Sequence, residues 1–583
     1  MHESLGEHTF VRHNALIQWS VAAVVLLLLA AGCGGSTHAA TPPTTTAPTT
    51  APTTTVAPPA PPESANRPHE FSDFRIAMDG TDYLDPGLSD TPEGWGVMWN
   101  VYLPLIGYRH RNSTAGATLV PYLAESLPRI SPDGLVYSLR LRPGLRYSNG
   151  DPVRASDFKR TIERDIALDS AGASFFDNIV GAKRFAKTQK RGISGIHVNN
   201  RKRTIAIHLV DPEGDFENVL ASEFAAPVPS NAPRTDTTLH PLPASGPYQI
   251  VSYQPHGRIV ELRNPHFQAW RFHGTVPRGN PDRVTWDIVP TARAALRAVL
   301  SGKDDWMGYW PVSKDRLADL EKHYANRLRV STLPTLDYFF MNTKRAPFDN
   351  LAVRRAVNYA ISRKVLVHLA GGPAKTTENI LPPDYSSYQQ HKLYRHNFEK
   401  AKRLVAASGE RGKRVTVWNH DVPGDLPFTK YLVSVLNKLG FKAHEHVVTP
   451  SDYWSTLSER STNAQIGFAN WLQDYPHPLD WFGALLDGRQ TEAARNDNYA
   501  YFDDPSVNRK IESLTRRPAP SPALDAQWRS LDRQVMKLAP WAPFLNREAV
   551  DFFSARVQLR KKCYVNNVLY GFDYASICVK KTP

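Results

Sequence analysis

The side chains that could perform catalysis do not fall into a recognised catalytic spacing. The sequence contains neither a GxSxG nucleophile elbow nor a GxxxxGK(S/T) phosphate loop. Ser156 and Lys159 have the SxxK spacing of penicillin-recognising enzymes, but no KTG triad completes that site. His444 and His446 lie too close together to share one face of a helix around zinc. We therefore predict a helix cap at Ser156 and an alternating β-strand through the two histidines.

The cysteine at position 33 has a spacing that indicates lipidation. It follows an apolar segment, residues 21–31, whose length is that of a signal-peptide core and is too short for a membrane span. Together with the small residues before it, Cys33 resembles the bacterial lipobox, in which a peptidase cleaves before a cysteine that receives diacylglycerol. We expect a lipoprotein signal peptide over residues 1–32 and a lipidated Cys33. The alternative is a buried apolar helix with a core cysteine.

The two other cysteines, Cys563 and Cys578, lie close together near the end of the chain. In an exported protein such a pair favours a disulfide. Two free thiols in a core remain an alternative. A zinc site is a further alternative, but no CxxC pair or spaced histidines accompany these cysteines.

The composition is that of a soluble globular protein with a basic balance. The chain has 583 residues, a formal net charge of +14 and 41% apolar residues. Such a charge could serve nucleic acid, anionic lipid or a solvated surface. Because Lys and Arg are spread along the chain and the leader directs export, we favour the solvated surface and expect no nucleic-acid partner. Thr, Pro and Ala dominate residues 33–68, which we expect to be an extended linker.

The globular part alternates strands with helices. Runs rich in β-branched and aromatic residues predict strands at 137–141, 204–209, 248–253 and 414–418. Apolar residues at helical spacing predict helices over 353–361, 428–439 and 524–538, the first capped by Asp349. This alternation favours an α/β architecture with partly parallel sheets.

Residues 121–163 read PYLAESLPRISPDGLVYSLRLRPGLRYSNGDPVRASDFKRTIE. They closely resemble the extracellular solute-binding proteins, family 5, which serve peptide, nickel and related ABC importers. Further blocks follow in the family's order: GPY at 246–248 with RNP at 263–265, MNTKRAPFD at 341–349, and WLQDYPHP at 471–478. The resemblance thus covers nearly all of the chain after the linker.

The resemblance implies a two-lobed α/β fold of the type II periplasmic-binding-protein kind, with a hinge and an extra N-terminal subdomain. Residues 69–289 would form the first lobe, with the subdomain at about 110–240. Residues 290–545 would form the second lobe, and 546–583 would return to the first. Ligand would bind in the cleft between the lobes and be enclosed by hinge closure.

The family's binding residues can be placed on four positions. In peptide-binding relatives the aspartate of the WxxD loop holds the α-amino group of the ligand, and here it is Asp474. A carboxylate suits a buried ammonium, because a charge-assisted hydrogen bond contributes about 1.5–3 kcal/mol. Trp471 and Tyr475 could pack on the ligand, and Asn342 lies in a cleft-lining block. The arginine that holds the ligand's carboxylate in dipeptide-binding relatives is missing from residues 419–427.

Taken together, these features predict a binding protein that releases its ligand intact and needs no catalytic residue, cofactor or metal. We expect a lipid-anchored, monomeric receptor on the extracytoplasmic face of the cell membrane, which captures oligopeptides or similar solutes for the membrane subunits of an ABC importer. The alternatives are a tethered hydrolase of peptides or cell-wall fragments, a receptor for a cationic non-peptide such as a nickel chelate, and a receptor for sensing without import.

Overall fold

The computed structural model describes residues 72–494, 496–517, 521–560, 563–567, 569 and 571–580. The predicted signal peptide, Cys33 and the predicted linker lie outside the described residues. Within the described part, every helix is too short or too polar to cross a lipid bilayer.

The first sheet has the strand order β1-β10-β9-β8, with β1 and β10 parallel and the other neighbours antiparallel. Its strands are β1 (Asp73–Met78), β8 (Tyr248–Gln254), β9 (Arg258–Arg263) and β10 (Arg283–Ile288). Buried residues of β1 and β10, such as Phe74 and Trp286, belong to one apolar core with α1 (Pro92–Met98). Phe572 from the C-terminal segment joins that core, where its ring lies 6.0 Å from that of Phe74.

A second, antiparallel sheet has the order β4-β5-β7-β6. Its strands are β4 (Arg129–Ile130), β5 (Val136–Arg140), β6 (Ile196–Asn199) and β7 (Thr204–His208). On β5, Tyr137 and Leu139 are buried while Ser138 and Arg140 are exposed, so one face packs and the other meets solvent. The packed face shares a core with α2 (Ala155–Ala167), α3 (Ala182–Thr188) and α4 (Phe216–Val219). A hairpin, β2 (Ile106–Tyr108) and β3 (Leu119–Pro121), completes this region.

The third sheet has the order β11-β17-β12-β16-β14-β15, and β13 pairs with β17. Its strands are β11 (Leu328–Thr332), β12 (Thr335–Met341), β13 (Ala374–Thr376), β14 (Arg414–His420), β15 (Lys442–Val448), β16 (Ile466–Leu472) and β17 (Trp541–Phe552). All of β12 is buried, and its side chains alternate between two cores, Tyr338 and Phe340 in one and Phe339 and Met341 in the other. A strand buried on both faces explains the apolar run in its sequence.

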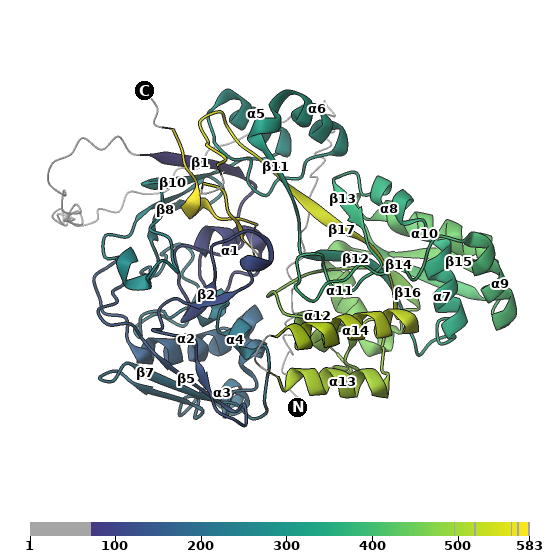
Figure 1. Ribbon diagram of the computed structural model, residues 1–583, viewed down its shortest axis with the longest axis horizontal. Helices are drawn as coiled ribbons and strands as arrows, with labels where there is room; N and C mark the ends of the chain where they lie inside the picture. The colour runs from purple at the N-terminus through teal and green to yellow at the C-terminus, as the bar shows by residue number, and fades with distance from the viewer. Residues whose placement is uncertain are drawn as a thin grey trace, which may run out of the picture. The chain divides into compact units, whose positions relative to one another are not determined.

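Helices pack in both of these cores and in a further one. Those grouped in the sequence before β17 are α5 (Ala292–Ser301), α6 (Lys314–Tyr324), α7 (Leu351–Ala360), α8 (Arg363–Leu369), α9 (Phe398–Ser408), α10 (Leu426–Leu439), α11 (Pro450–Ser458), α12 (Leu479–Leu486), α13 (Pro505–Thr515) and α14 (Pro522–Leu538). Figure 1 shows α12, α13 and α14 beside one another, in agreement with their contacts. Residues of α7, α9 and α10 pack in the core that contains Phe339, and residues of α12, α13 and α14 pack in the core that contains Tyr338.

The C-terminal segment contains two short strands, β18 (Asn566–Asn567) and β19 (Gly571–Phe572), which pair in antiparallel fashion. Cys563 and Cys578 form a disulfide around this pair. Closing a loop of this sequence separation, 15 residues, stabilises a fold by about 3 kcal/mol in the chain-entropy account.

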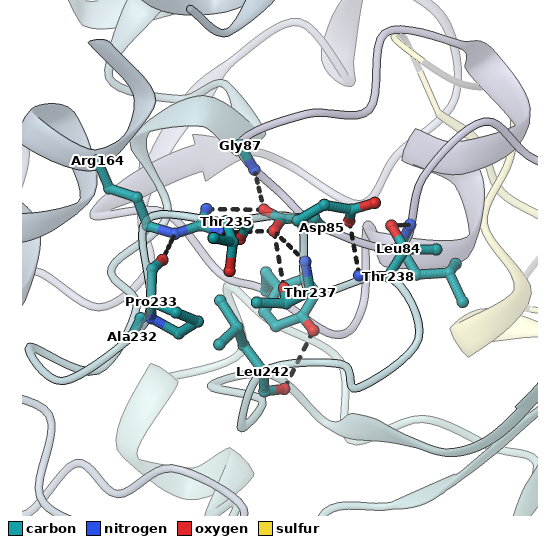
Figure 2. Close-up of polar contacts among 12 residues, drawn as sticks. Leu84, Asp85, Gly87, Arg164, Ala232, Pro233, Thr235, Thr237, Thr238 and Leu242 are labelled. Carbon is teal, nitrogen blue, oxygen red and sulfur yellow. Dashed lines mark hydrogen bonds and ion pairs between the residues drawn. The ribbon is translucent and has the colours of Figure 1, made fainter. Parts of the chain in front are cut away.

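The loop between β1 and α1 is held by a buried ion pair (Figure 2). Asp85 accepts hydrogen bonds from the Arg164 guanidinium at 2.8 and 2.5 Å and from the Thr237 hydroxyl at 2.7 Å. Gly87 also donates its N–H to Asp85, and a Cβ there would lie 2.4 Å from Asp165 Oδ1. The ion pair thus joins the loop after β1 of the first sheet to α2, which packs against the second sheet.

Two predicted helix caps were wrong by one or two residues. The predicted cap Ser156 lies inside α2, whose N-cap is Arg154; its N–H donates to Asp157 Oδ2 at 2.8 Å. Asn350 caps α7 in place of Asp349, because the Asn350 side chain accepts the N–H of Ala352. The strand predicted through 444–446 is present as β15, with alternating half-buried and exposed residues.

Candidate functional site

The segment 471–478 leaves the end of β16 and carries three of the four predicted binding residues. Trp471 lies opposite Leu336 of β12, and the pairing of the two strands ends one residue later, at Leu472 opposite Thr335. Asp480 at the start of α12 then orders the segment, since its Oδ2 accepts the Trp471 indole N–H at 3.3 Å and the Asp474 backbone N–H at 3.2 Å. Asp480 is buried, and its ring and backbone donors are those expected for a structural carboxylate.

Trp471 and Asp474 line a small cavity of about 80 Å³, which we call the Asp474 cavity. It is lined by Asp90, Trp95, Ala171, Ser174, Phe175, Phe224, Trp471, Asp474, Ala484 and Asp497. Its charged lining residues are therefore three carboxylates, without any Lys or Arg among the described residues of its wall. Aromatic rings supply much of the remaining surface, with Trp95 and Phe224 meeting edge to face at 6.2 Å.

Asp90 is an acid of this cavity whose ionisation is strongly disfavoured. Burial, followed by the nearby charges of Asp474 and Asp82, raises the pKa of Asp90 to about 9. Its Oδ2 is buried and receives no hydrogen bond from the described residues. A carboxyl group in this state is suited to a cation that enters the cavity, because a positive charge would replace the missing partner and relieve the repulsion from Asp474.

Tyr475 points the other way along the segment and joins two parts of the fold. Its hydroxyl donates to Asp215 Oδ2 at 2.7 Å, just before α4. Its ring meets that of Phe175 at 6.1 Å. Burial and the carboxylates around it, Asp215 first, raise the pKa of Tyr475 well above its ordinary value, so the hydroxyl stays protonated and donates. Tyr475 therefore acts between protein segments rather than lining the Asp474 cavity.

A second cavity, of about 410 Å³, lies along the same segment. We call it the Trp528 cavity. Gln473, Pro476, His477 and Pro478 contribute to its wall from the segment, and Glu217, Asn218, Asp384, Ser387, Leu524, Asp525 and Trp528 are among the residues that complete it. Burial lowers the pKa of His477, which favours a neutral imidazole. The two cavities thus flank residues 471–478.

The structure places Asn342 outside the walls of both cavities. Its amide donates to the Ala464 carbonyl at 2.9 Å and accepts the N–H of Lys344 at 3.0 Å. The side chain is buried and serves backbone groups, which is the ordinary task of an interior asparagine.

Residues 419–427, which lack the arginine of dipeptide-binding relatives, are contacted by an arginine from elsewhere in the chain. Arg547 of β17 contacts Asp425 at 3.1 Å, but it also contacts Asp337 at 2.6 Å. Both acids are largely buried, so two carboxylates already neutralise this guanidinium. Arg547 is consequently ill suited to hold the carboxylate of a ligand as well.

The chain is similar in sequence to known solute-binding proteins. The sequence pattern of the bacterial extracellular solute-binding proteins, family 5, matches residues 118–493. The chain belongs to this family. The glutathione-binding protein GsiB of Escherichia coli O1:K1 / APEC, a curated relative, is 25% identical over 448 residues, which are 74% of this chain and 81% of that protein. The predicted family is thereby confirmed.

Solved structures agree with the fold. The clavulanic acid biosynthesis oligopeptide binding protein 2 superposes with a TM-score of 0.79 at 23% identity, covering 88% of this chain and 96% of that one. The periplasmic binding protein DppA from Helicobacter pylori, solved with the peptide STSA, gives a TM-score of 0.68 at 19% identity over 88% and 99% of the two chains. The predicted two-lobed α/β fold is confirmed by these family 5 likenesses.

Sequence reasoning missed several residues of the site, above all Asp90, Trp95, Asp215 and Glu217. Asp90 lies in a polar loop, SDTPEG, whose sequence looks like an ordinary helix start. Its partner Asp474 is remote in sequence, so only the folded chain brings the two acids together. A run of acids around α4, residues 211–217, was the one local signal that could have pointed to Asp215 and Glu217.

Proposed function

We propose that this family 5 protein is an extracytoplasmic receptor that captures peptides or similar small solutes bearing a free amino group and delivers them to an ABC importer. Relatives support this proposal, because the matched proteins are described as binding glutathione or oligopeptides. One of the structural neighbours is described as associated with an ABC transporter and holds a peptide.

The observation that carries the proposal is the pairing of Asp90 with Asp474 in a small cavity walled by aromatic rings. Burial, and after it the charge of Asp474, raises the pKa of Asp90, so the cavity disfavours a second negative charge. An ammonium between them would donate charge-assisted hydrogen bonds to the two carboxylates, each contributing about 1.5–3 kcal/mol. Trp95 and Trp471 would contact the carbon atoms next to that ammonium.

Capture requires a change of state that the ligand itself favours. In the proposal, ligand contacts made from both sides of the cleft stabilise the closed form more than the open form, and closure is what the importer recognises. The Tyr475 hydrogen bond to Asp215 is a protein contact of the same kind. No nucleophile or general base is needed, because the ligand leaves unchanged.

The test is to incubate the purified protein with free-amine tripeptides and to measure both binding and peptide integrity. The proposal expects saturable binding by calorimetry and full recovery of the intact peptide by mass spectrometry. Progressive appearance of shorter products would instead establish a tethered hydrolase. Nickel chelates in the same titration would reveal a receptor for a cationic non-peptide.

We further propose that Cys33 carries a lipid anchor and that the lobes span 69–289, 290–545 and the returning segment 546–583. The packing of Phe572 against Phe74 supports the return of the C-terminal segment. A Cys33→Ala form should appear in the medium and bind ligand normally. Retention of that form in the membrane fraction would contradict lipid anchoring and indicate an uncleaved leader.

A further inference from the structure

The Trp528 cavity has an unusual balance of charge for this chain. Its described wall contains three carboxylates, Glu217, Asp384 and Asp525, and neither Lys nor Arg. The protein as a whole carries a formal net charge of +14. A basic protein that places only acids around a cavity creates a local negative potential, which favours a positively charged occupant.

Two of the three carboxylates of this wall have no hydrogen-bond partner in the described part of the chain. Glu217 and Asp384 receive no hydrogen bond from the part of the chain that the structure describes, whereas Asp525 accepts one from the Ser386 hydroxyl at 3.0 Å. Burial raises the pKa of Glu217 to about 7 and also raises that of Asp384. The desolvation of these two acids is therefore not offset by a hydrogen bond from the described residues.

Two cations near the wall are engaged elsewhere. Lys375, whose charge reaches Asp384, pairs with Glu548 at 2.7 Å. Arg529 donates to the carbonyl of Ser386 at 3.2 Å. Neither side chain lines the cavity, so each leaves the carboxylates open to a cation from outside.

The remaining wall suits the carbon stem of a long cationic side chain. Trp528, Leu524 and Tyr385 provide buried apolar surface. Ser387, also part of the wall, is only 1% exposed, yet its hydroxyl has no hydrogen-bond partner among the described residues. Lysine and arginine bury their methylene groups on such surfaces while the charged head reaches polar atoms.

We propose that the Trp528 cavity is a specificity subsite that receives a lysine or arginine side chain of a peptide ligand. The charge on that side chain would meet Glu217 and Asp384, and its stem would lie against Trp528. This inference rests on the proposed peptide-receptor function and adds the ligand class, a basic peptide. The same segment, residues 471–478, would then contact the ligand in both cavities.

The test compares tripeptides that differ only in the charge of one side chain. Ala-Lys-Ala, Lys-Ala-Ala and Ala-Ala-Lys are titrated into the wild-type protein by calorimetry, each beside its methionine counterpart, which has a similar length without charge. We expect at least one lysine peptide to bind about tenfold more tightly or better than its counterpart, as one charged hydrogen bond would give.

Variants then locate the source of the preference. Glu217→Gln and Asp384→Asn, separately and together, should reduce the lysine preference while leaving the methionine peptides unaffected. Glu321→Gln removes one charge from an exposed position of α6, away from the cavity wall, and should retain the preference. Thermal unfolding of each variant shows that the protein measured is folded.

The outcomes separate this inference from the proposed function. Equal affinity for lysine and methionine at all three positions in the wild type would overturn the basic subsite and leave the receptor function intact. A lysine preference that survives in the double variant would also overturn it. No binding of any free-amine peptide would overturn the proposed function and this inference with it.

Discussion

Asp85 and Asp90 lie in the same loop before α1, yet their surroundings are opposite. Asp85 is buried against Arg164 and Thr237, and although burial raises its pKa, the hydrogen bonds and charge of Arg164 outweigh that effect and lower the pKa overall. Asp90 is half-buried beside Asp82 and Asp474, and the burial of its carboxyl together with these charges raises its pKa to about 9. The first acid finds its counter-charge within the protein, and the second faces like charges at a cavity.

This difference distinguishes two kinds of desolvated acid. One kind has its charge balanced within the protein, and the other has a charge that a bound cation could balance. The Asp85 ion pair joins two parts of the chain and contributes to stability. The Asp90 carboxyl contributes a cost, because it must take up a proton or accept repulsion when the cavity lacks a cation. Binding sites often retain such a cost, since a ligand can then relieve it.

The largest expected effect is on the ion pair. Asp85→Asn would leave the Arg164 guanidinium, 1% exposed, without its counter-charge. Breaking such a buried pair lowers the free energy of unfolding by about 3–5 kcal/mol. Urea unfolding at pH 7 measures this loss.

The pH dependence gives the Asp85 prediction its own control. Because the folded-state pKa of Asp85 lies below the usual 3.8, its stabilisation is present above that pH and disappears as the pH falls through the folded-state value. The gap between wild type and variant should therefore narrow in acid. An unchanged stability at pH 7 would contradict the structural role of the pair.

Asp90→Asn should raise the free energy of unfolding, whereas Asp85→Asn should lower it. Since the folded-state pKa of about 9 exceeds the model-peptide value of 3.8, the wild type loses stability as the pH rises from about 4 towards 9. The amide does not titrate, so at pH 7 the variant should be more stable by up to about 4 kcal/mol, and the gain should vanish near pH 4. Thermal unfolding across this pH range checks the sign.

For Asp90, a variant that is less stable than the wild type at pH 7 would show that the carboxylate has a structural partner after all. The two loop positions would then no longer differ in kind. Asp85→Asn serves as the matched comparison, because it makes the same chemical change in the same loop.

The smallest expected effect concerns the hydrogen bond between Tyr475 and Asp215. Tyr475→Phe removes one hydrogen bond, to Asp215, and leaves the ring against Phe175. A single hydrogen bond from a neutral donor to a charged acceptor contributes about 1.5–3 kcal/mol at most. When the protein opens, water replaces much of this bond, so ligand affinity should fall only about threefold to tenfold. Calorimetry with a free-amine peptide measures the change.

For Tyr475, a loss as large as that from removing Asp474 would place the tyrosine in the binding site itself. An affinity that does not change would show that the hydrogen bond is equally present in the open state. Either result would show whether the Tyr475 hydroxyl acts on ligand binding directly or on the closure of the lobes.

Much of the fold was predictable because local patterns and global packing agree. The apolar stripe of α10 and the alternation along β5 each specify an element that the structure contains. The helix caps were wrongly predicted at Ser156 and Asp349, because sequence alone does not decide between these residues and their neighbours Arg154 and Asn350, which are the caps. Caps depend on the angle at which the chain enters the helix, which tertiary packing sets.

The candidate site was only partly predictable. Trp471, Asp474 and Tyr475 stand together in one motif, so their proximity was certain, but their tasks differ once folded. Asp90 and Glu217 reach the site from distant loops, and no local pattern distinguishes them from solvated acids. Asn342 is the opposite case. It belongs to a family motif, but its side chain hydrogen-bonds to the backbone and lines neither cavity.

The most direct measurement of the central claim compares one peptide with its N-acetylated form on the wild type and on Asp474→Ala. If Asp474 holds an ammonium, acetylation should weaken binding to the wild type by about 10- to 100-fold, corresponding to about 1.5–3 kcal/mol. The Asp474→Ala protein should bind the two forms about equally, because the group that distinguishes them is gone. An acetylation penalty of the same size in both proteins would contradict the role of Asp474 and the account of the cavity built on it.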